Sequence, residues 1–279
     1  HECLPFNPYI LLTWLFWGVS SGELALSFTR LTQTTAQRSS ASDADSRKTN
    51  RAATHGPKKC LTPQTMNFPV PVLFDLLLKR HGPQHWWPAR TMTGMMVGAV
   101  LVQNTAWTQA SKAVDQLEER GLLDFTAICE TPDETLWDVI RPAGYFRIKT
   151  QRLKALARFM APWGDICQVI HPHNQELRLN LLEIHGIGKE TADSILCYAA
   201  QQPVFVVDAY TKRLFLRLGW VDEKAGYDQM QRIIHETIPM EPHILGEFHA
   251  LIVRHAKENC LKRPRCQNCP VVICPSIPN

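Results

Sequence analysis

Apolar residues recur at helical spacing through most of the chain beyond residue 65. In FPVPVLFDLLLKRHGP, a Gly-Pro pair ends a segment whose apolar face holds Val72, Leu73, Leu76 and Leu77. The next stretch, TMTGMMVGAVLVQNTAWTQASKAVDQLEERG, predicts an apolar helix, a QNTAW turn and an amphipathic helix over about residues 108–119. Because no segment combines β-branched alternation with hairpin turns, the pattern predicts an all-α fold.

More helices are expected in the middle of the chain. Thr131 and Pro132 precede two acidic residues, which is typical of a helix start. The segment RPAGYFRIKTQRL breaks at Pro142 and Gly144 and then restarts as a basic helix. We expect a solvated face from the cations of this helix, which are Arg147, Lys149, Arg152 and Lys154.

A glycine turn lies in HGIGKETADSILCYAA. Gly186 and Gly188 bracket one apolar residue just before Lys189, and apolar residues at helical spacing follow. Glycine lets the backbone approach a phosphate closely, and the unpaired N–H groups of a first helical turn favour negative charge. The pattern predicts a turn at a helix start that can hold an anion, although such turns also occur in purely structural helix pairs.

A carboxylate follows at the end of the apolar run in VVDAYTKR. Asp208 stands where that run stops and the next helix opens, so it fits the N-cap position. We expect its carboxylate at the mouth of the groove between the two helices.

Four of the nine cysteines cluster near the C-terminus as Cx5Cx2Cx4C. Thiolates grouped this tightly share a metal or form disulfides, and the sequence context favours a metal. One CxxC flanked by single cysteines favours a 4Fe-4S cluster over zinc. The expected ligands are Cys260, Cys266, Cys269 and Cys274. The other five cysteines are scattered, which indicates a reduced, intracellular chain, and we expect a cytoplasmic protein.

Composition adds a weaker indication. A formal net charge of +4 and a pI near 8.6 permit a nucleic-acid partner. Residues 1–65 combine a short apolar run, PYILLTWLFWGVSS, with a Ser-, Thr- and Arg-rich stretch that cannot sustain a core. We interpret them as disordered or as a spurious extension. A membrane anchor on a flexible tether is the alternative.

The pair HGIGKETA and VVDAYTKR resembles the helix-hairpin-helix and Gly/Pro-Asp signature of the endonuclease III superfamily of DNA glycosylases. The resemblance implies that the hairpin grips the DNA backbone and that Asp208 is the catalytic carboxylate. It also implies a C-terminal 4Fe-4S cluster, with one more residue in each longer loop than this chain has. Bifunctional members carry a nucleophilic lysine where this chain has Glu190, and a carboxylate cannot form a Schiff base.

The motifs WWP, VLVQNTAW and IRPAGYFRIKTQRL resemble, more narrowly, the 3-methyladenine DNA glycosylase III branch. That resemblance implies a base pocket, for which we expect Trp86, Trp87, Pro88, Trp107, Glu190 and Lys257. Flat aromatic rings suit a flipped and alkylated base. The tryptophans could instead simply bury apolar area between helices, and Lys257 could be one more polar residue on an amphipathic helix.

Contacts to DNA are expected from several residues. The resemblance makes Asn104 the residue that fills the gap left by the flipped nucleotide, although a simple capping role is equally open. The hairpin would contribute Gly186, Gly188 and Lys189. Cations on the first cysteine loop would bind phosphates, and these are Lys262, Arg263 and Arg265.

These inferences predict a monofunctional DNA glycosylase that hydrolyses alkylated purines, of the 3-methyladenine type, from duplex DNA in base excision repair. We expect a monomer with two helical lobes, one of residues 91–204 and the other of residues 66–90 and 205–279. Two alternatives stay open. One is a bifunctional glycosylase/lyase acting on oxidised pyrimidines, and the other is a non-catalytic DNA-binding module.

Overall fold

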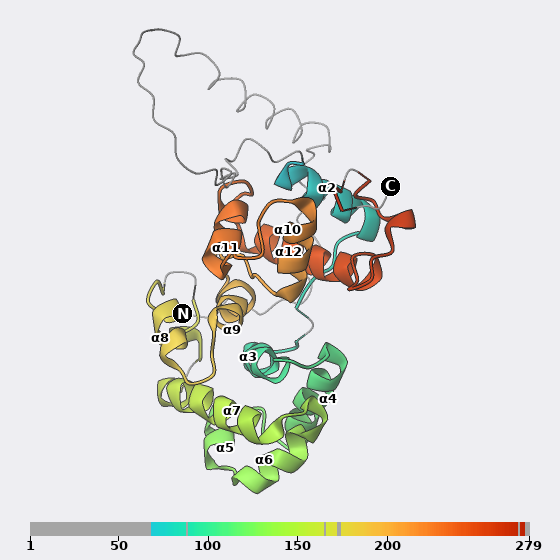
Figure 1. Ribbon diagram of the computed structural model, residues 1–279. Helices are drawn as coiled ribbons and strands as arrows, with labels where there is room; N and C mark the ends of the chain where they lie inside the picture. Colours follow the sequence, from blue (N-terminus) through green and yellow to red (C-terminus); the bar gives the residue numbers. More distant parts are fainter. Residues whose placement is uncertain (1–67, 88, 165, 172–173, 273, 277–279) are drawn as a thin grey trace, which may run out of the picture. The chain divides into compact units, whose positions relative to one another are not determined.

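The computed structural model describes residues 68–87, 89–164, 166–171, 174–272 and 274–276 (Figure 1). These residues form helices and no strand, so the all-α prediction is confirmed. The expectations for residues 1–65 and for Pro88 fall outside the described residues. Among the helices of the described ranges, none is long and apolar enough to cross a membrane.

A first group of helices encloses one hydrophobic core, to which Met95, Leu101, Leu153 and Leu181 contribute fully buried side chains. Thr91 caps the apolar helix of this group by accepting a hydrogen bond from the Gly94 amide. The group consists of α3 (Met92–Leu101), α4 (Trp107–Glu119), α5 (Phe125–Glu130), α6 (Asp133–Ile140), η2 (Arg141–Ala143), α7 (Phe146–Met160), η3 (Ala161–Trp163), η4 (Ile166–Gln168), α8 (Leu177–Glu183), α9 (Lys189–Ser194) and the π-helical η5 (Ile195–Ala199).

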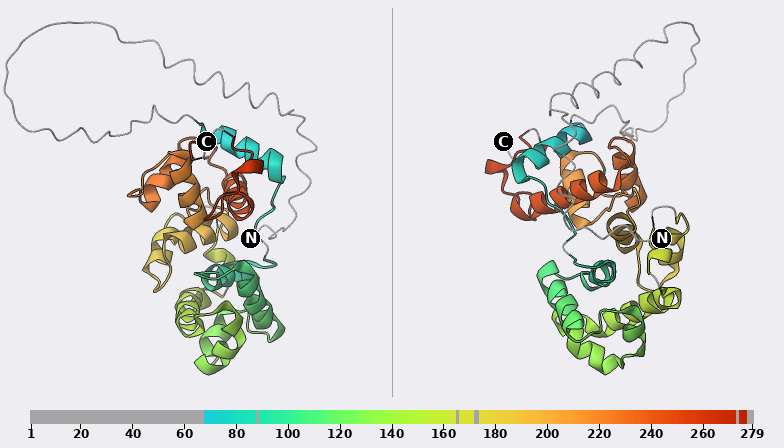
Figure 2. Two further views of the ribbon diagram at one scale, coloured as in Figure 1. Left: turned by 45° about the vertical axis from the view of Figure 1, so that its right-hand side comes forward. Right: turned by 180° about the vertical axis from the view of Figure 1, so that it is seen from behind.

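A second group joins the early helix to the C-terminal part of the chain, and Figure 2 shows it in cyan, orange and red. It consists of α2 (Val70–His81), α10 (Ala209–Leu218), α11 (Tyr227–His235), α12 (Pro242–Glu258) and η6 (Cys266–Asn268). Its core holds Phe68, Phe205, Phe215 and Phe248, all buried. The ring of Phe248 packs edge-on against Phe74, with 5.3 Å between the ring centroids.

Buried hydrogen bonds connect the two groups. The carboxylate of Asp193 on α9 is fully buried and accepts hydrogen bonds from Tyr227 and Gln231 on α11, each at 2.8 Å. Arg178 on α8 also donates to it, at 2.6 Å. A buried charge is stable only when it is paired in this way. Since the partners come from both groups, Asp193 fixes the helix that carries the glycine turn.

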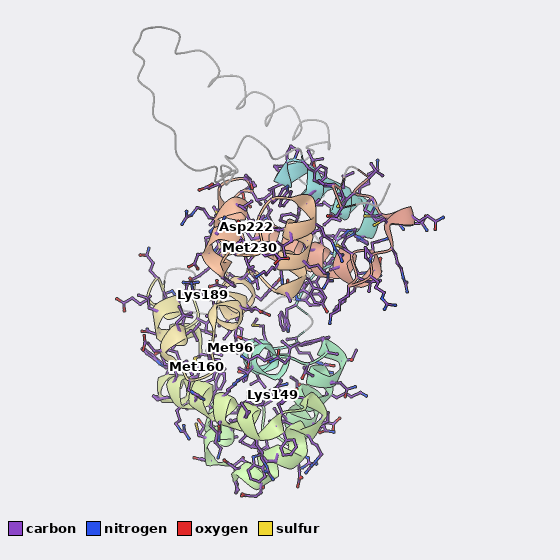
Figure 3. All side chains as sticks on the ribbon, viewed as in Figure 1. Met96, Lys149, Met160, Lys189, Asp222 and Met230 are labelled. Atoms are coloured by element: carbon purple, nitrogen blue, oxygen red, sulfur yellow. The ribbon has the colours of Figure 1, made fainter. Side chains whose placement is uncertain are left out.

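The prediction of a solvated face on α7 is wrong for three of its four cations. Arg147 is the exposed one, whereas Arg152 is half-buried and donates a hydrogen bond to Gln103. Lys149, labelled in Figure 3, is 1% exposed. Its ammonium donates to Leu101 O, Thr105 Oγ1 and Ala143 O at 2.7, 2.8 and 2.7 Å. Lys154 is half-buried and pairs with an aspartate of α6. Burial and the neighbouring Arg152 lower the pKa of Lys149 from 10.5 to about 8. This lysine fastens the QNTAW turn to α3 and η2.

Replacing Lys149 by methionine should destabilise the protein by about 3 kcal/mol, because the Leu101 carbonyl and the Thr105 hydroxyl would lose this donor and the Ala143 carbonyl would lose one of its two. Urea unfolding followed by circular dichroism measures this change. The control Lys112→Met, at an exposed position of α4, should change stability by less than about 0.5 kcal/mol. If Lys149→Met is as stable as the wild type, the free-energy cost of desolvating the ammonium offsets the stabilisation from its hydrogen bonds.

Candidate active site

Asp208 is the N-cap residue of α10, as the sequence predicts. Its backbone is extended, and its Oδ1 atom accepts a hydrogen bond from the Thr211 amide at 2.7 Å. The Asp208 side chain is 12% exposed. The carboxylate is therefore held by the first turn of the helix while part of it is accessible to a ligand.

Two carboxyl groups at the site have pKa values shifted in opposite directions. Burial would raise the pKa of Asp208, but the nearby His249 and the Thr211 amide outweigh it, so that the pKa lies below 3.8. Glu190 is exposed as a residue, but desolvation of its carboxyl group and then the charge of Asp208 raise its pKa from the usual 4.5. Asp208 is thus the carboxylate that stays charged, whereas Glu190 takes up a proton more readily.

Two residues that sequence reasoning missed, Tyr198 and His249, lie beside Asp208. The Tyr198 hydroxyl is 2.6 Å from Nδ1 of His249 and donates to the Gly246 carbonyl at 3.1 Å. Nε2 of His249 is 3.6 Å from Oδ2 of Asp208. Gly246 makes the approach possible, because a Cβ atom there would lie only 3.0 Å from the tyrosine ring.

The predicted tryptophans form one aromatic cluster with Tyr198. The ring centroid of Trp87 lies 6.0 Å from Trp86, 5.1 Å from Trp107 and 5.4 Å from Tyr198. Gly98 on α3 leaves room for two of these rings, since a Cβ atom there would lie 3.2 Å from Trp107. The buried indole N–H groups of Trp86 and Trp87 have no hydrogen-bond partner among the described residues. Unpaired buried donors of this kind are available to a ligand.

Lys257 on α12 reaches the same cluster. Its ammonium lies 5.8 Å from the ring centroid of Trp86 and 5.9 Å from that of Tyr210, within the range of cation–π attraction. Trp86 comes from the loop after α2, and Tyr210 lies two residues after the catalytic candidate Asp208. Lys257 therefore connects the aromatic cluster to the start of α10.

The QNTAW turn and the glycine turn lie together. Gln103 donates from Nε2 to the Gly186 carbonyl at 3.0 Å and to Thr191 Oγ1 at 2.9 Å. Asn104, next in the chain, has a φ of 53°. Gly186 has a φ of 85°, and a Cβ atom there would collide with the Arg152 side chain. The sequence did not single out Gln103, although it holds the two predicted contact turns in register.

Other predicted contact residues differ in their surroundings. Gly188 is the N-cap residue of α9. Lys189 is exposed, but its ammonium is paired with Asp228, 2.6 and 2.8 Å from the two carboxylate oxygens.

Tyr145, which sequence reasoning missed, is 68% exposed at the start of α7. A hydrogen bond of 2.6 Å from Thr105 to the Ala143 carbonyl holds its loop beside the QNTAW turn.

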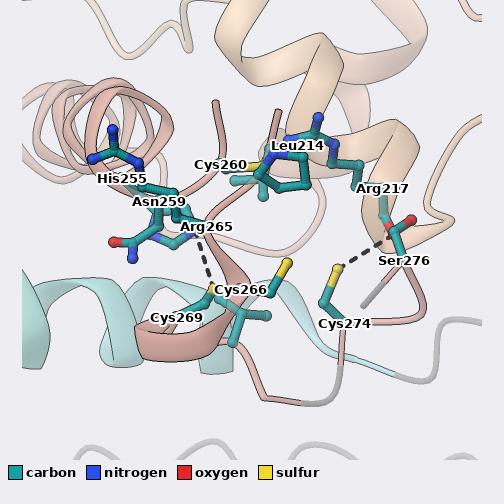
Figure 4. A pocket seen from close by; sticks show the side chains of 12 residues that line it. Leu214, Arg217, His255, Asn259, Cys260, Arg265, Cys266, Cys269, Cys274 and Ser276 are labelled. Atoms are coloured by element: carbon teal, nitrogen blue, oxygen red, sulfur yellow. Dashed lines mark hydrogen bonds between the residues drawn. The ribbon is translucent and has the colours of Figure 1, made fainter. Parts of the chain in front are cut away.

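The four C-terminal cysteines line one pocket near the far end of α10 (Figure 4). All four thiols are free. Arg217 donates to Cys260 Sγ at 3.0 Å, and His255 Nε2 lies 3.7 Å from Cys269 Sγ. Burial and the neighbouring thiols raise the pKa of Cys269. In the described residues, no three His, Cys, Asp or Glu side chains are close enough together to hold a single metal ion.

The cations of the first cysteine loop are exposed, as expected for residues that contact a ligand from solution. They are Lys262, Arg263 and Arg265. Arg265 also lines the cysteine pocket. The backbone carbonyl of Lys262 accepts a hydrogen bond from Arg217 at 3.0 Å, so this loop and the cysteine pocket share an anchor on α10.

Known proteins resemble this chain over most of its described length. A protein of Methanocaldococcus jannaschii, whose name assigns it provisionally to the DNA repair glycosylases, is 43% identical over 202 residues, covering 71% of this chain and 92% of its own. Endonuclease III of Sulfolobus acidocaldarius is 27% identical over 184 residues, covering 65% of this chain and 80% of its own.

Solved structures agree with the sequence comparison. The 3-methyladenine DNA glycosylase of H. pylori bound to 1,N6-ethenoadenine superimposes with a TM-score of 0.58 at 28% identity, over 67% of this chain and 96% of its own. A trapped endonuclease III–DNA covalent intermediate gives a TM-score of 0.64 at 21% identity, over 77% of this chain and 97% of its own. This similarity shows a shared fold.

The sequence pattern of one protein family matches residues 97–240, about half of the chain, and is described as the HhH-GPD superfamily base excision DNA repair protein. This range contains the glycine turn and Asp208, although not the WWP motif or the four cysteines. The chain therefore belongs to the HhH-GPD superfamily of base excision DNA repair proteins and is a DNA glycosylase.

Proposed function

We propose that this glycosylase is monofunctional and removes alkylated purines of the 3-methyladenine type from duplex DNA. The observation that carries the proposal is the arrangement around Asp208. A charged carboxylate is held at a helix start, Tyr198 and His249 link it to an aromatic cluster, and Glu190 stands where a lyase has its lysine. The H. pylori glycosylase named above supports the choice of substrate class.

The chemistry follows from the leaving group. A 3-methylpurine nucleotide already carries positive charge on its base, so the glycosidic bond breaks with little help from a general acid. Positive charge then develops on the sugar. Asp208 would stabilise that charge electrostatically and orient a water for attack, because its carboxylate remains ionised at neutral pH.

The base would be received by the aromatic cluster, with Trp86, Trp87 and Trp107 supplying apolar surface. The two unpaired indole N–H groups can donate to acceptor atoms of a purine. Lys257 introduces a competing effect, since its positive charge opposes a cationic base and accepts a neutral one more readily. Neutral ethenoadenine is therefore the lesion to compare directly with cationic 3-methyladenine.

DNA contacts are assigned to the two turns that Gln103 joins. The backbone amides at Gly186 and Gly188 would hold one phosphate, and Asn104 would project toward the gap in the duplex. Lys262, Arg263 and Arg265 would add salt-sensitive affinity that does not depend on base sequence. Lys189 would contribute less than its position in the hairpin indicates, because Asp228 already neutralises its charge.

The cysteine pocket fits a 4Fe-4S cluster. Four thiols face one space, and the Arg217 guanidinium donates a hydrogen bond to Cys260 Sγ. Cys260, Cys266, Cys269 and Cys274 would hold it. A cluster at this place would shape the basic loop, since hydrolysis of the glycosidic bond requires no electron transfer.

Asp208→Asn should abolish base release while binding to the lesion-bearing duplex stays within about two-fold of wild type, because asparagine caps a helix nearly as well as aspartate. The assay is alkaline cleavage of the abasic product across a panel of duplexes carrying 3-methyladenine, 7-methylguanine or ethenoadenine. The matched control is Asp222→Asn, at an exposed turn position that also accepts a backbone hydrogen bond. Equal loss of binding and release would make Asp208 only a structural cap.

Borohydride should not trap a covalent complex with any of these duplexes, because the position of the lyase nucleophile is Glu190. The expected product is an intact strand with an abasic site, which gel electrophoresis distinguishes from a cleaved strand. A trapped adduct would instead favour the glycosylase/lyase alternative. Failure to release any base from the panel would favour a non-catalytic DNA-binding module.

Protein purified without oxygen should contain about four irons per chain and absorb visible light, as a cluster with four cysteine ligands does. Cys269→Ser should lose both signals, whereas Cys129→Ser should keep them because that thiol lies outside the pocket. Elemental analysis decides between iron and zinc. One zinc per chain, or no metal in the wild type, would contradict the assignment.

A further inference from the structure

His249 is a buried imidazole with one nitrogen unused. Its residue is 5% exposed, and Nε2 has no hydrogen-bond partner among the described residues. That nitrogen lies 3.6 Å from Oδ2 of Asp208, too far for a direct hydrogen bond. Buried polar atoms are nearly always satisfied, so an unsatisfied one next to a catalytic carboxylate indicates a place for a bound molecule.

The position of the proton on the opposite nitrogen decides what Nε2 can do. The Tyr198 hydroxyl has one proton, which it can donate either to the Gly246 carbonyl at 3.1 Å or to Nδ1 of His249 at 2.6 Å. In the first arrangement the hydroxyl accepts from His249, so Nδ1 carries the ring proton. In the neutral ring Nε2 is therefore a lone-pair acceptor that faces a carboxylate. Two acceptors face each other without repulsion when a donor with two protons, such as water, lies beside both.

We propose that His249 is a second catalytic residue, which holds the attacking water together with Asp208 and accepts its proton. The inference rests on the proposed glycosylase function. An oxygen lone pair of the water forms the new bond to the anomeric carbon, and the electron pair of the glycosidic C–N bond leaves with the base. The proton lost by the water passes to Nε2. The resulting imidazolium is stabilised by the Asp208 carboxylate and later releases its proton to solvent.

The surroundings of His249 favour this role over simple core packing. Glu190 and Asp208 are the acidic groups that interact with it, and Tyr198 is the hydroxyl that does. The ring of Phe205 meets the imidazole edge-on, with 6.3 Å between the ring centroids, and fixes its plane. Tyr198 also packs against Trp87. A base bound at the aromatic cluster would therefore be connected, through Trp87 and Tyr198, to the imidazole that orients the water.

His249→Phe tests the proposal, because phenylalanine keeps the ring but removes both nitrogens. With enzyme in excess over a lesion-bearing duplex, the rate of base release should fall about 100-fold, the lower end of a general-base contribution. Affinity for a duplex containing a stable tetrahydrofuran abasic site should stay within about two-fold of wild type. The matched control is His243→Phe, the same exchange at an exposed position of α12, which should leave the rate unchanged.

His249→Gln and His249→Ala supply independent readouts. Glutamine can still accept a hydrogen bond from water but cannot take its proton, so its rate should fall between those of wild type and His249→Phe. Imidazole added to His249→Ala should restore base release in proportion to its concentration, and it should not rescue Asp208→Asn.

The inference and the proposed function fail in different ways. If the wild type releases no base from the lesion panel, the proposed function is wrong. A wild type that is active, an Asp208→Asn variant that is inactive and a His249→Phe variant within three-fold of wild type would together overturn only the role of His249. If His249→Phe does not fold, a wild-type rate for His249→Gln together with no imidazole rescue of His249→Ala overturns it equally.

Discussion

The hydrogen bond from the Thr211 amide to the Asp208 carboxylate is the interaction on which the site depends. It places a negative charge at the first turn of α10, where the helix itself favours such a charge. Burial alone would raise the pKa of the carboxyl group, and His249 together with the amide outweighs that effect. The protein thus keeps an ionised carboxylate in a poorly solvated place, where its effect on a developing positive charge is strongest.

The same helix connects this charge to the cysteine pocket. Asp208 caps its first turn, and Arg217 in its last turn donates to Cys260 and to the loop that carries Lys262. Movement of the cysteine loop would therefore be transmitted to the end of α10 opposite the carboxylate. Gln103 connects the QNTAW turn to the glycine turn in a comparable way, by hydrogen bonds to Gly186 and Thr191. Short hydrogen bonds at helix ends position both the chemical group and the predicted DNA contacts.

Local sequence patterns predicted the features that depend on local structure. The N-cap role of Asp208 and the glycine turn before α9 follow from residues within a few positions, and both are confirmed. Tyr198 and His249 escaped prediction because their contact joins residues 51 positions apart, on helices that read as ordinary amphipathic segments. Lys149 was placed wrongly for a related reason. Its partners Leu101 and Thr105 lie 48 and 44 residues away, and helical periodicity cannot identify acceptors across a core.

Binding of a charged mimic of the reacting sugar tests the central claim most directly, because it isolates the electrostatic effect of Asp208 from every later step. The measurement compares the Kd of a duplex carrying a cationic pyrrolidine abasic nucleotide with that of a duplex carrying the neutral tetrahydrofuran analogue. A carboxylate that stabilises positive charge at the sugar predicts at least about 100-fold tighter binding of the pyrrolidine duplex by wild type. Asp208→Asn should lose that preference. Equal affinity of the wild type for both duplexes would contradict the account.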